Sequence, residues 1–172
     1  MAGNIVDFSR IESLGRVTEL YFTPSQQPPS AMRDEVIGRL VHLANLQRLT
    51  VLSFADTHIT DAGLAHLSGM GELRTLHITN AQISGEGFQS AGLQRLMNLF
   101  LGGSQITDGG LMQIASFPNL TSLNLSRTQI TDAGITQLRG LPNLQWMNLR
   151  NTTVTEQAKA ALMASRPGLR VD

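Results

Sequence analysis

The sequence predicts an α/β fold, a right-handed solenoid whose concave parallel β-sheet carries helices on its convex side. Three observations lead to this prediction. A pattern of apolar residues recurs about every 24 residues through most of the 172-residue chain. Each copy opens on alternating leucines, the period-two pattern of a short strand. Each copy continues with a hydroxyl residue suited to starting a helix. One strand and one helix per copy, repeated in register, require a parallel sheet with right-handed crossovers.

The repeats align when the chain is divided at its leucines. Five lines begin at Leu49, Leu73, Leu96, Leu120 and Leu144, which are 24, 23, 24 and 24 residues apart. Their strand segments read LTVLSF, LRTLHI, LMNLFL, LTSLNL and LQWMNL. A small residue follows three places later, usually with a hydroxyl. The second line has Ala81 there, and Asn80 is the residue expected to replace the missing hydrogen bond.

The helical part of each repeat is predicted to begin at a hydroxyl that caps the helix. These residues are Thr60, Ser84, Thr107, Thr131 and Thr155. Asp61, Asp108, Asp132 and Glu156 come next, placed to complement the helix dipole. The aspartates could suggest a cation site, but helix capping is the preferred interpretation. The pairs Gly102-Gly103 and Gly109-Gly110 lack the lysine and spacing of a phosphate loop, so they are interpreted as close-packing positions.

The two ends of the chain are predicted to complete one domain that spans residues 1–172. Residues 1–16 form a helical cap, residues 17–48 a first repeat, residues 49–168 five regular repeats and residues 169–172 a closing strand. The first repeat carries an insertion, TPSQQPPSA at residues 23–31. Its prolines fit neither helix nor strand interior. It is either a flexible spacer or a loop that flanks a ligand.

The helix-start motif carries a resemblance to a known family. It reads ITDAGL at 59–64, ITDGGL at 106–111 and ITDAGI at 130–135. With the leucine pattern, it resembles the leucine-rich repeat proteins, in particular a bacterial type abundant in planctomycetes and, more distantly, the repeats of F-box proteins. The resemblance is strong over residues 49–172. It implies a leucine-rich repeat solenoid that binds a protein or peptide on its concave sheet.

Side chains that alternate with the buried leucines are predicted to face outward on the concave sheet. The candidate ligand-binding residues are Glu19, Tyr21, Ser53, His77, Asn98, Phe100, Asn124, Trp146, Asn148 and Arg150. The single tyrosine and the single tryptophan both belong to this set. Large aromatic side chains on a solvated sheet are candidate binding anchors. The alternative is that loops or neighbouring side chains cover them.

Composition disfavours several other classes of function. Thirteen basic residues balance thirteen acidic ones, so no excess positive charge favours nucleic acid. The chain has no cysteine, and its four histidines lack the spacing of metal ligands, so we expect no metal and no cofactor. No segment reaches the roughly 18 apolar residues of a membrane helix. No signal peptide is visible, which favours the cytoplasm.

An enzyme is the remote alternative. Ser53 and His77 occupy the same column of neighbouring predicted strands, with Asp56 nearby, so a hydrolase triad can be drawn. No nucleophile elbow frames Ser53, and an open sheet excludes no water. The sequence therefore predicts a non-catalytic scaffold. A structural or regulatory repeat segment of a larger protein is the second possibility.

Overall fold

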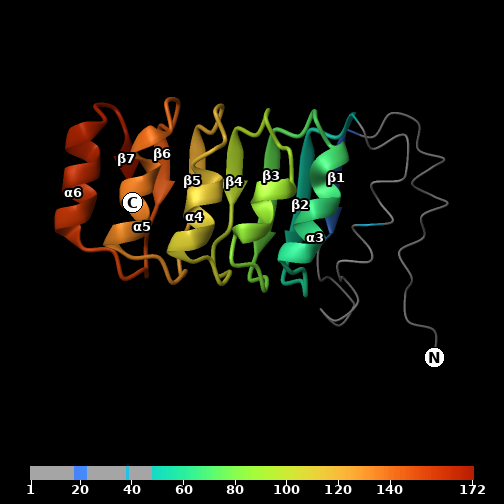
Figure 1. The fold of residues 1–172 in the computed structure, drawn as a ribbon, viewed down its shortest axis with the longest axis horizontal. Helices are drawn as coiled ribbons and strands as arrows, with labels where there is room; N and C mark the ends of the chain where they lie inside the picture. The colour runs from blue at the N-terminus through green and yellow to red at the C-terminus, as the bar shows by residue number, and fades with distance from the viewer. Residues whose placement is uncertain (1–17, 23–37, 39–47) are drawn as a thin grey trace.

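A single parallel sheet runs the length of the structure, a computed structural model that describes residues 18–22, 38 and 48–172. Its seven strands lie in chain order, each paired in parallel with the next. They are β1 (Glu19–Phe22), β2 (Val51–Ala55), β3 (Thr75–Thr79), β4 (Asn98–Phe100), β5 (Ser122–Asn124), β6 (Trp146–Asn148) and β7 (Arg170–Val171). Figure 1 shows the helices forming a second layer on one face of this sheet. The predicted fold class is confirmed.

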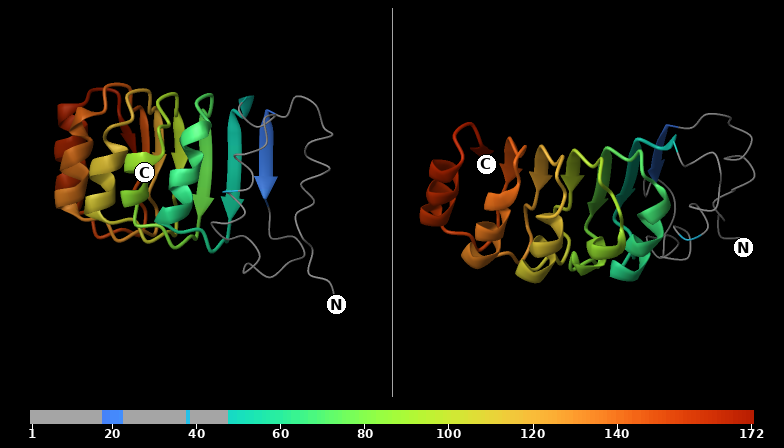
Figure 2. Two further views of the ribbon diagram at one scale, coloured as in Figure 1. Left: turned by 45° about the vertical axis from the view of Figure 1, so that its right-hand side comes forward. Right: turned by 45° about the horizontal axis from the view of Figure 1, so that its top comes forward.

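Within the described residues, the helical layer has one segment for each of the five regular repeats. Its members are α3 (Asp61–Ala65) with η3 (His66–Gly69), η4 (Glu86–Ser90), α4 (Asp108–Ile114), α5 (Asp132–Gln137) with η5 (Leu138–Gly140), and α6 (Glu156–Ser165). Helices are wider than strands, so the layer that contains them takes the convex side (Figure 2). The helix capping predicted for the threonines is confirmed, because each threonine oxygen accepts a backbone N–H two or three residues later.

The second repeat departs from the prediction. Its segment η4 is a 3-10 helix, not an α-helix, and Ser84 is not its N-cap. The cap is Gly85, which has a φ of 95°, a left-handed conformation that favours glycine. This glycine stands where most of the other repeats have aspartate. The Ser84 hydroxyl accepts a hydrogen bond from the Glu86 N–H at 3.3 Å and donates one to Asp61 at 2.8 Å.

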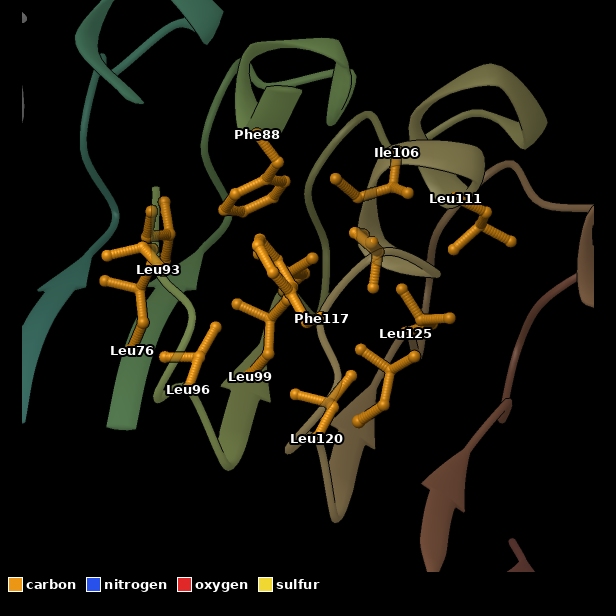
Figure 3. Close-up of a cluster of buried hydrophobic side chains, with 14 of the residues drawn as sticks. Leu76, Phe88, Leu93, Leu96, Leu99, Ile106, Leu111, Phe117, Leu120 and Leu125 are labelled. Atoms are coloured by element: carbon orange, nitrogen blue, oxygen red, sulfur yellow. The ribbon is translucent and has the colours of Figure 1, made fainter. Parts of the chain in front are cut away.

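Leucines from the strands form the centre of the core. Leu52, Leu76, Leu99, Leu123 and Met147 occupy one register position on successive strands, and all five are fully buried. Residues from the helical layer pack against these leucines and complete the core. Phe88 and Phe117 meet edge to face there, with ring centroids 5.7 Å apart (Figure 3).

The turn at Ala81 is completed by the following repeat. The Ser104 hydroxyl accepts a hydrogen bond from the Ala81 N–H at 3.1 Å and donates one to the Ile78 carbonyl at 3.0 Å. The expectation that Asn80 would replace the hydroxyl was wrong. Asn80 has a φ of 55° and donates instead to Asp56 of the preceding repeat, at 2.6 Å.

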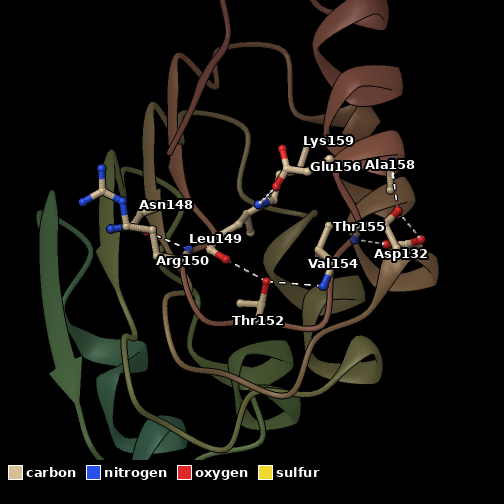
Figure 4. A network of polar contacts seen from close by, with 10 residues as sticks. All are labelled: Asp132, Asn148, Leu149, Arg150, Thr152, Val154, Thr155, Glu156, Ala158 and Lys159. Atoms are coloured by element: carbon tan, nitrogen blue, oxygen red, sulfur yellow. Dashed lines mark hydrogen bonds and ion pairs between the residues drawn. The ribbon is translucent and has the colours of Figure 1, made fainter.

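The aspartates at the helix starts join neighbouring repeats. The Asp61 carboxylate accepts four hydrogen bonds of 2.8–3.0 Å, from the Ser84 hydroxyl and from the N–H groups of Ser84, Gly85 and Gly87. Asp108 accepts from the N–H and hydroxyl of Thr131. Asp132 does the same with Thr155 (Figure 4). These residues lie in the first helical turns, as predicted, but the sequence analysis missed the bonds between repeats.

Glycines near these aspartates allow neighbouring repeats to lie close to each other. A methyl group at Gly87 would overlap the Asp61 carbonyl oxygen, one at Gly110 the Ser84 carbonyl oxygen, and one at Gly134 the Asp108 carboxylate. Close packing is therefore confirmed for Gly110, and also for Gly102 and Gly103, whose added methyl groups would meet Ser126 and Asn80. It was wrong for Gly109, which is exposed and has only ordinary contact distances around it.

Several predicted features fall outside the described residues. These are the cap at residues 1–16, the insertion at residues 23–31 and most of the first repeat. At the other end, β7 pairs with β6 and receives the chain from α6. The division of residues 1–172 into cap, repeats and closing strand stays a prediction.

We predict that Asp61→Asn lowers the free energy of unfolding by about 1.5–3 kcal/mol, because an amide cannot accept all four hydrogen bonds. Urea denaturation measures the loss. Glu86→Gln is the matched control, since Glu86 is an exposed first-turn acid that, within the described part of the chain, accepts no hydrogen bond from a neighbouring repeat. Equal stability of the two variants would show that the carboxylate does not couple the repeats.

Candidate functional site: the concave sheet face

Strand register arranges the candidate residues in two columns. One column runs through Tyr21, Ser53, His77, Phe100, Asn124 and Asn148. The other runs through Glu19, Val51, Thr75, Asn98, Ser122, Trp146 and Arg170. Arg150 follows β6 and lies beside Asn148, with its guanidinium pointing away from the core (Figure 4). The structure thus places all ten predicted site residues on or beside this face.

Three rings form a continuous row across the middle of the face. His77 on β3 stacks on Phe100 of β4, with ring centroids 4.2 Å apart and planes 12° apart. Phe100 also neighbours Trp146 of β6, at 6.4 Å and 47°. All three side chains are half-buried, so each keeps part of its surface open. We call His77, Phe100 and Trp146 the aromatic row.

The other rings and polar groups are arranged around this row. Tyr21 is 56% exposed and lies beyond Ser53, so it is not part of the row. Its hydroxyl donates to Glu19 Oε2 at 3.2 Å. The indole Nε1 of Trp146 donates to Asp172 Oδ2 at 3.1 Å, which anchors one edge of that ring. This contact with Asp172 was not anticipated, since nothing in the repeat pattern points to the C-terminal residue.

The asparagines on this face have structural partners. Asn98 donates to the Thr75 hydroxyl at 3.0 Å. The Oδ1 atoms of Asn124 and Asn148 each accept a backbone N–H two residues later, at 3.0 Å. Part of each side chain therefore shapes the strand or the turn that follows it.

Ser53 and His77 lie opposite each other, as their spacing predicted. No hydrogen bond between them is present in the described part of the chain, and the His77 ring stacks on Phe100. Partial burial holds the pKa of His77 below its ordinary value of 6.5, so the ring is neutral at pH 7. Asp56 binds the Asn80 amide. This geometry does not assemble the arrangement of nucleophile, base and carboxylate that a hydrolase triad needs.

Two further searches concern metals and membranes. Among residues 18–22, 38 and 48–172, no three histidine or acidic side chains gather closely enough to hold a metal ion. Within the same residues, every helix is too short or too polar to cross a bilayer.

Comparisons with known proteins agree with this fold. A family model described as Leucine Rich repeat matches residues 45–68 and 118–138. A search of curated proteins finds no match. Among solved structures, internalin C2 of Listeria monocytogenes is similar, with a TM-score of 0.69 and 26% identity over 96% of this chain and 65% of that one.

Two other solved structures show the same likeness. The internalin inlF of Listeria monocytogenes has a TM-score of 0.68 and 24% identity, covering 96% of this chain and 50% of that one. A leucine-rich repeat protein of Leptospira interrogans has a TM-score of 0.66 and 22% identity, covering 94% and 38%. The chain spans less than two thirds of the length of each of these proteins. Its fold is that of a leucine-rich repeat solenoid.

Proposed function

We propose that this chain is a non-catalytic scaffold that binds a protein or peptide on its concave face. The observation that carries the proposal is the aromatic row, in which three half-buried rings from β3, β4 and β6 meet on the face that the solenoid leaves uncovered by its helices. Protein-protein interaction is the common use of the leucine-rich repeat fold. The repeats are proposed to be of the bacterial type with the I-T-D-x-G-L motif.

The physical properties of the row suit a binding anchor. Its rings are mounted on paired strands, so little side-chain freedom is lost when a partner covers them. Stacking and the bond to Asp172 further restrict His77 and Trp146. Aromatic side chains in preorganised positions dominate the binding energy of many interfaces.

Polar residues around the row would give the interface its specificity. Glu19, Tyr21 and Ser53 lie toward the first strand, while Asn98 and Asn124 lie beside the row. Asn148 and Arg150 lie toward the last strand. An apolar centre with a polar rim is the usual arrangement of a protein interface.

We predict that the double variant Phe100→Ala, Trp146→Ala weakens partner binding at least about tenfold, because truncating an aromatic anchor commonly costs 2 kcal/mol or more. Affinity capture from the native cell, read by quantitative mass spectrometry, identifies the proteins that wild type retains. Purified partner then gives the dissociation constants.

The matched control for this experiment is Met112→Ala. Met112 is 60% exposed on α4, on the helical side of the solenoid. It should keep wild-type binding, and all three proteins should have similar melting temperatures. Unchanged capture by the double variant would contradict concave binding and favour a structural or regulatory repeat segment, which acts through its ends.

The neutral state of His77 gives a pH prediction. Its pKa is lowered in the folded protein by burial. Between pH 6.5 and that lowered value, the unfolded chain therefore binds a proton that the folded chain does not. The stability that His77 contributes is complete above pH 6.5 and is lost as the pH falls through its folded pKa.

Urea denaturation between about pH 5 and pH 8 tests this, because a histidine titrates in that range. His77→Gln should reduce the loss of stability at acid pH, whereas His58→Gln, at an exposed position, should not. Nuclear magnetic resonance should place the pKa of His77 below 6.5. A value above 6.5 would mean that the ring is charged more readily than its burial allows.

A further inference from the structure

We propose that the edge of the sheet at which the strands begin binds an extended acidic peptide. Two pockets, of about 400 and 870 Å³, lie along this edge and share Asn143 and Gln145, so they form one groove. The edge is the one from which the strand arrows run in the left view of Figure 2. We call the two pockets the strand-start groove. Its charged lining residues are Arg74, Arg95, Arg139, Arg166 and Arg170.

The groove is positively charged and has no carboxylate in its lining. Arg95 pairs with Glu72 just outside it. The other four arginines form no ion pair with any residue of the described ranges. Arg166 is held in place because its Nη1 donates to the Arg139 carbonyl at 3.3 Å. Four guanidinium groups are thus available to carboxylates, which they bind in a two-pronged geometry.

Four acidic residues lie at the opposite edge, where the helices begin. Each of these residues lies in the first turn of its helix, beyond the C-terminal end of the preceding strand. They are Asp61, Asp108, Asp132 and Glu156. The three aspartates are occupied by hydrogen bonds to the next repeat. No acidic residue lines the strand-start groove, and four of its arginines form no ion pair within the described ranges, so the field at the groove attracts anions.

The dimensions of the groove suit a short extended chain. Arg74 lies at the start of β3 and Arg170 in β7, four strand spacings apart. At about 4.8 Å per spacing this distance is about 19 Å. An extended peptide covers it with about six residues. Acidic side chains at alternate positions of such a peptide would meet successive arginines.

A peptide fits this groove better than a nucleic acid does. Asn119, Asn143 and Gln145 also line the groove. The Nδ2 groups of Asn119 and Asn143 donate to the Gln94 and Pro118 carbonyls, so their Oδ1 atoms and the Gln145 amide are the groups that can pair with a peptide backbone. Single-stranded nucleic acid binds largely by stacking its bases on aromatic rings, and Trp146 is the one aromatic residue in the lining of the two pockets. The groove touches the aromatic row only at Trp146, so this inference stands whether or not the concave row binds a partner.

Titration of the whole chain with a synthetic peptide tests the proposal. The probe is a capped peptide of alternating glutamate and serine, about eight residues long to cover the groove. Trp146 lines the groove and is the only tryptophan, so its fluorescence reports binding. Calorimetry detects binding if the fluorescence does not change. The control ligands are the same peptide with glutamine in place of glutamate, and single-stranded oligothymidine.

The variant Arg139→Gln, Arg170→Gln removes two exposed groove charges. Arg127→Gln, Lys159→Gln removes the same charge at the opposite edge, where Arg127 is exposed and Lys159 pairs with Glu156. We expect the glutamate peptide to bind wild type, with affinity at least about tenfold weaker in the groove variant and within about twofold of wild type in the control variant. The glutamine peptide should not bind.

Three outcomes would overturn the proposal. The glutamate peptide could fail to bind wild type at low salt. It could lose affinity equally in both variants, which would make net charge the only cause. Oligothymidine could bind more tightly than the peptide and be lost in the groove variant, which would make the groove a nucleic-acid site. The melting temperatures of both variants should be similar to that of wild type. In that case a loss of folding does not explain the differences in peptide affinity.

Discussion

Consecutive repeats touch through their backbones at the helix starts, and the arrangement of the whole solenoid depends on this contact. An aspartate carboxylate of one repeat binds the N–H and hydroxyl groups that open the next helix. Gly87, Gly110 and Gly134, at the same position of three successive repeats, lack the side chain that would keep the repeats apart. Between the second and third repeats, where Gly85 replaces the aspartate, the Ser84 carbonyl accepts the Thr107 N–H at 3.1 Å instead, so this helix start also has an acceptor.

This contact also determines which side chains meet on the concave face. Because each repeat stacks on the last in one register, residues 23 or 24 positions apart fall into the same column. His77 and Phe100, which are far apart in the sequence, become stacked rings in this way. If the register of one strand shifted by one residue, the side chains of that strand would exchange faces. Its outward ring would enter the core and its leucine would move to the surface. The binding face is therefore a consequence of the packing.

The sequence was sufficient to predict whatever follows from periodicity alone. Alternation of leucines located the strands and identified Phe100 and Trp146 as outward-facing residues, since the period of two leaves no other choice. Threonine hydroxyls located four helix starts. Contacts between repeats were harder to predict, because they depend on distances in space that the spacing of residues along the chain does not give. The carboxylate bonds of Asp61 and the reach of Ser104 back to Ala81 belong to this kind.

The repeat pattern also did not predict the structure of the one repeat that departs from it. The glycine in place of aspartate at position 85 was visible in the sequence, but its left-handed conformation and the 3-10 helix after it occur in this repeat and not at the aspartates of the other repeats, so the shared pattern did not predict them. The strand-start groove was not predicted, because its arginines come from different parts of their repeats and from the end of α6. A repeat alignment compares equivalent positions, whereas this groove joins non-equivalent ones.

The central claim is that stacking of the repeats leaves an aromatic row open on the concave face, and Trp146 fluorescence tests it most directly. The single tryptophan is half-buried, with its Nε1 bonded to Asp172. We predict that acrylamide quenches its emission in the free protein, less than for free indole but clearly, and that Phe100→Ala increases the quenching by uncovering the neighbouring ring. A blue-shifted emission that acrylamide does not quench would mean that the ring is covered, and it would contradict an open concave row.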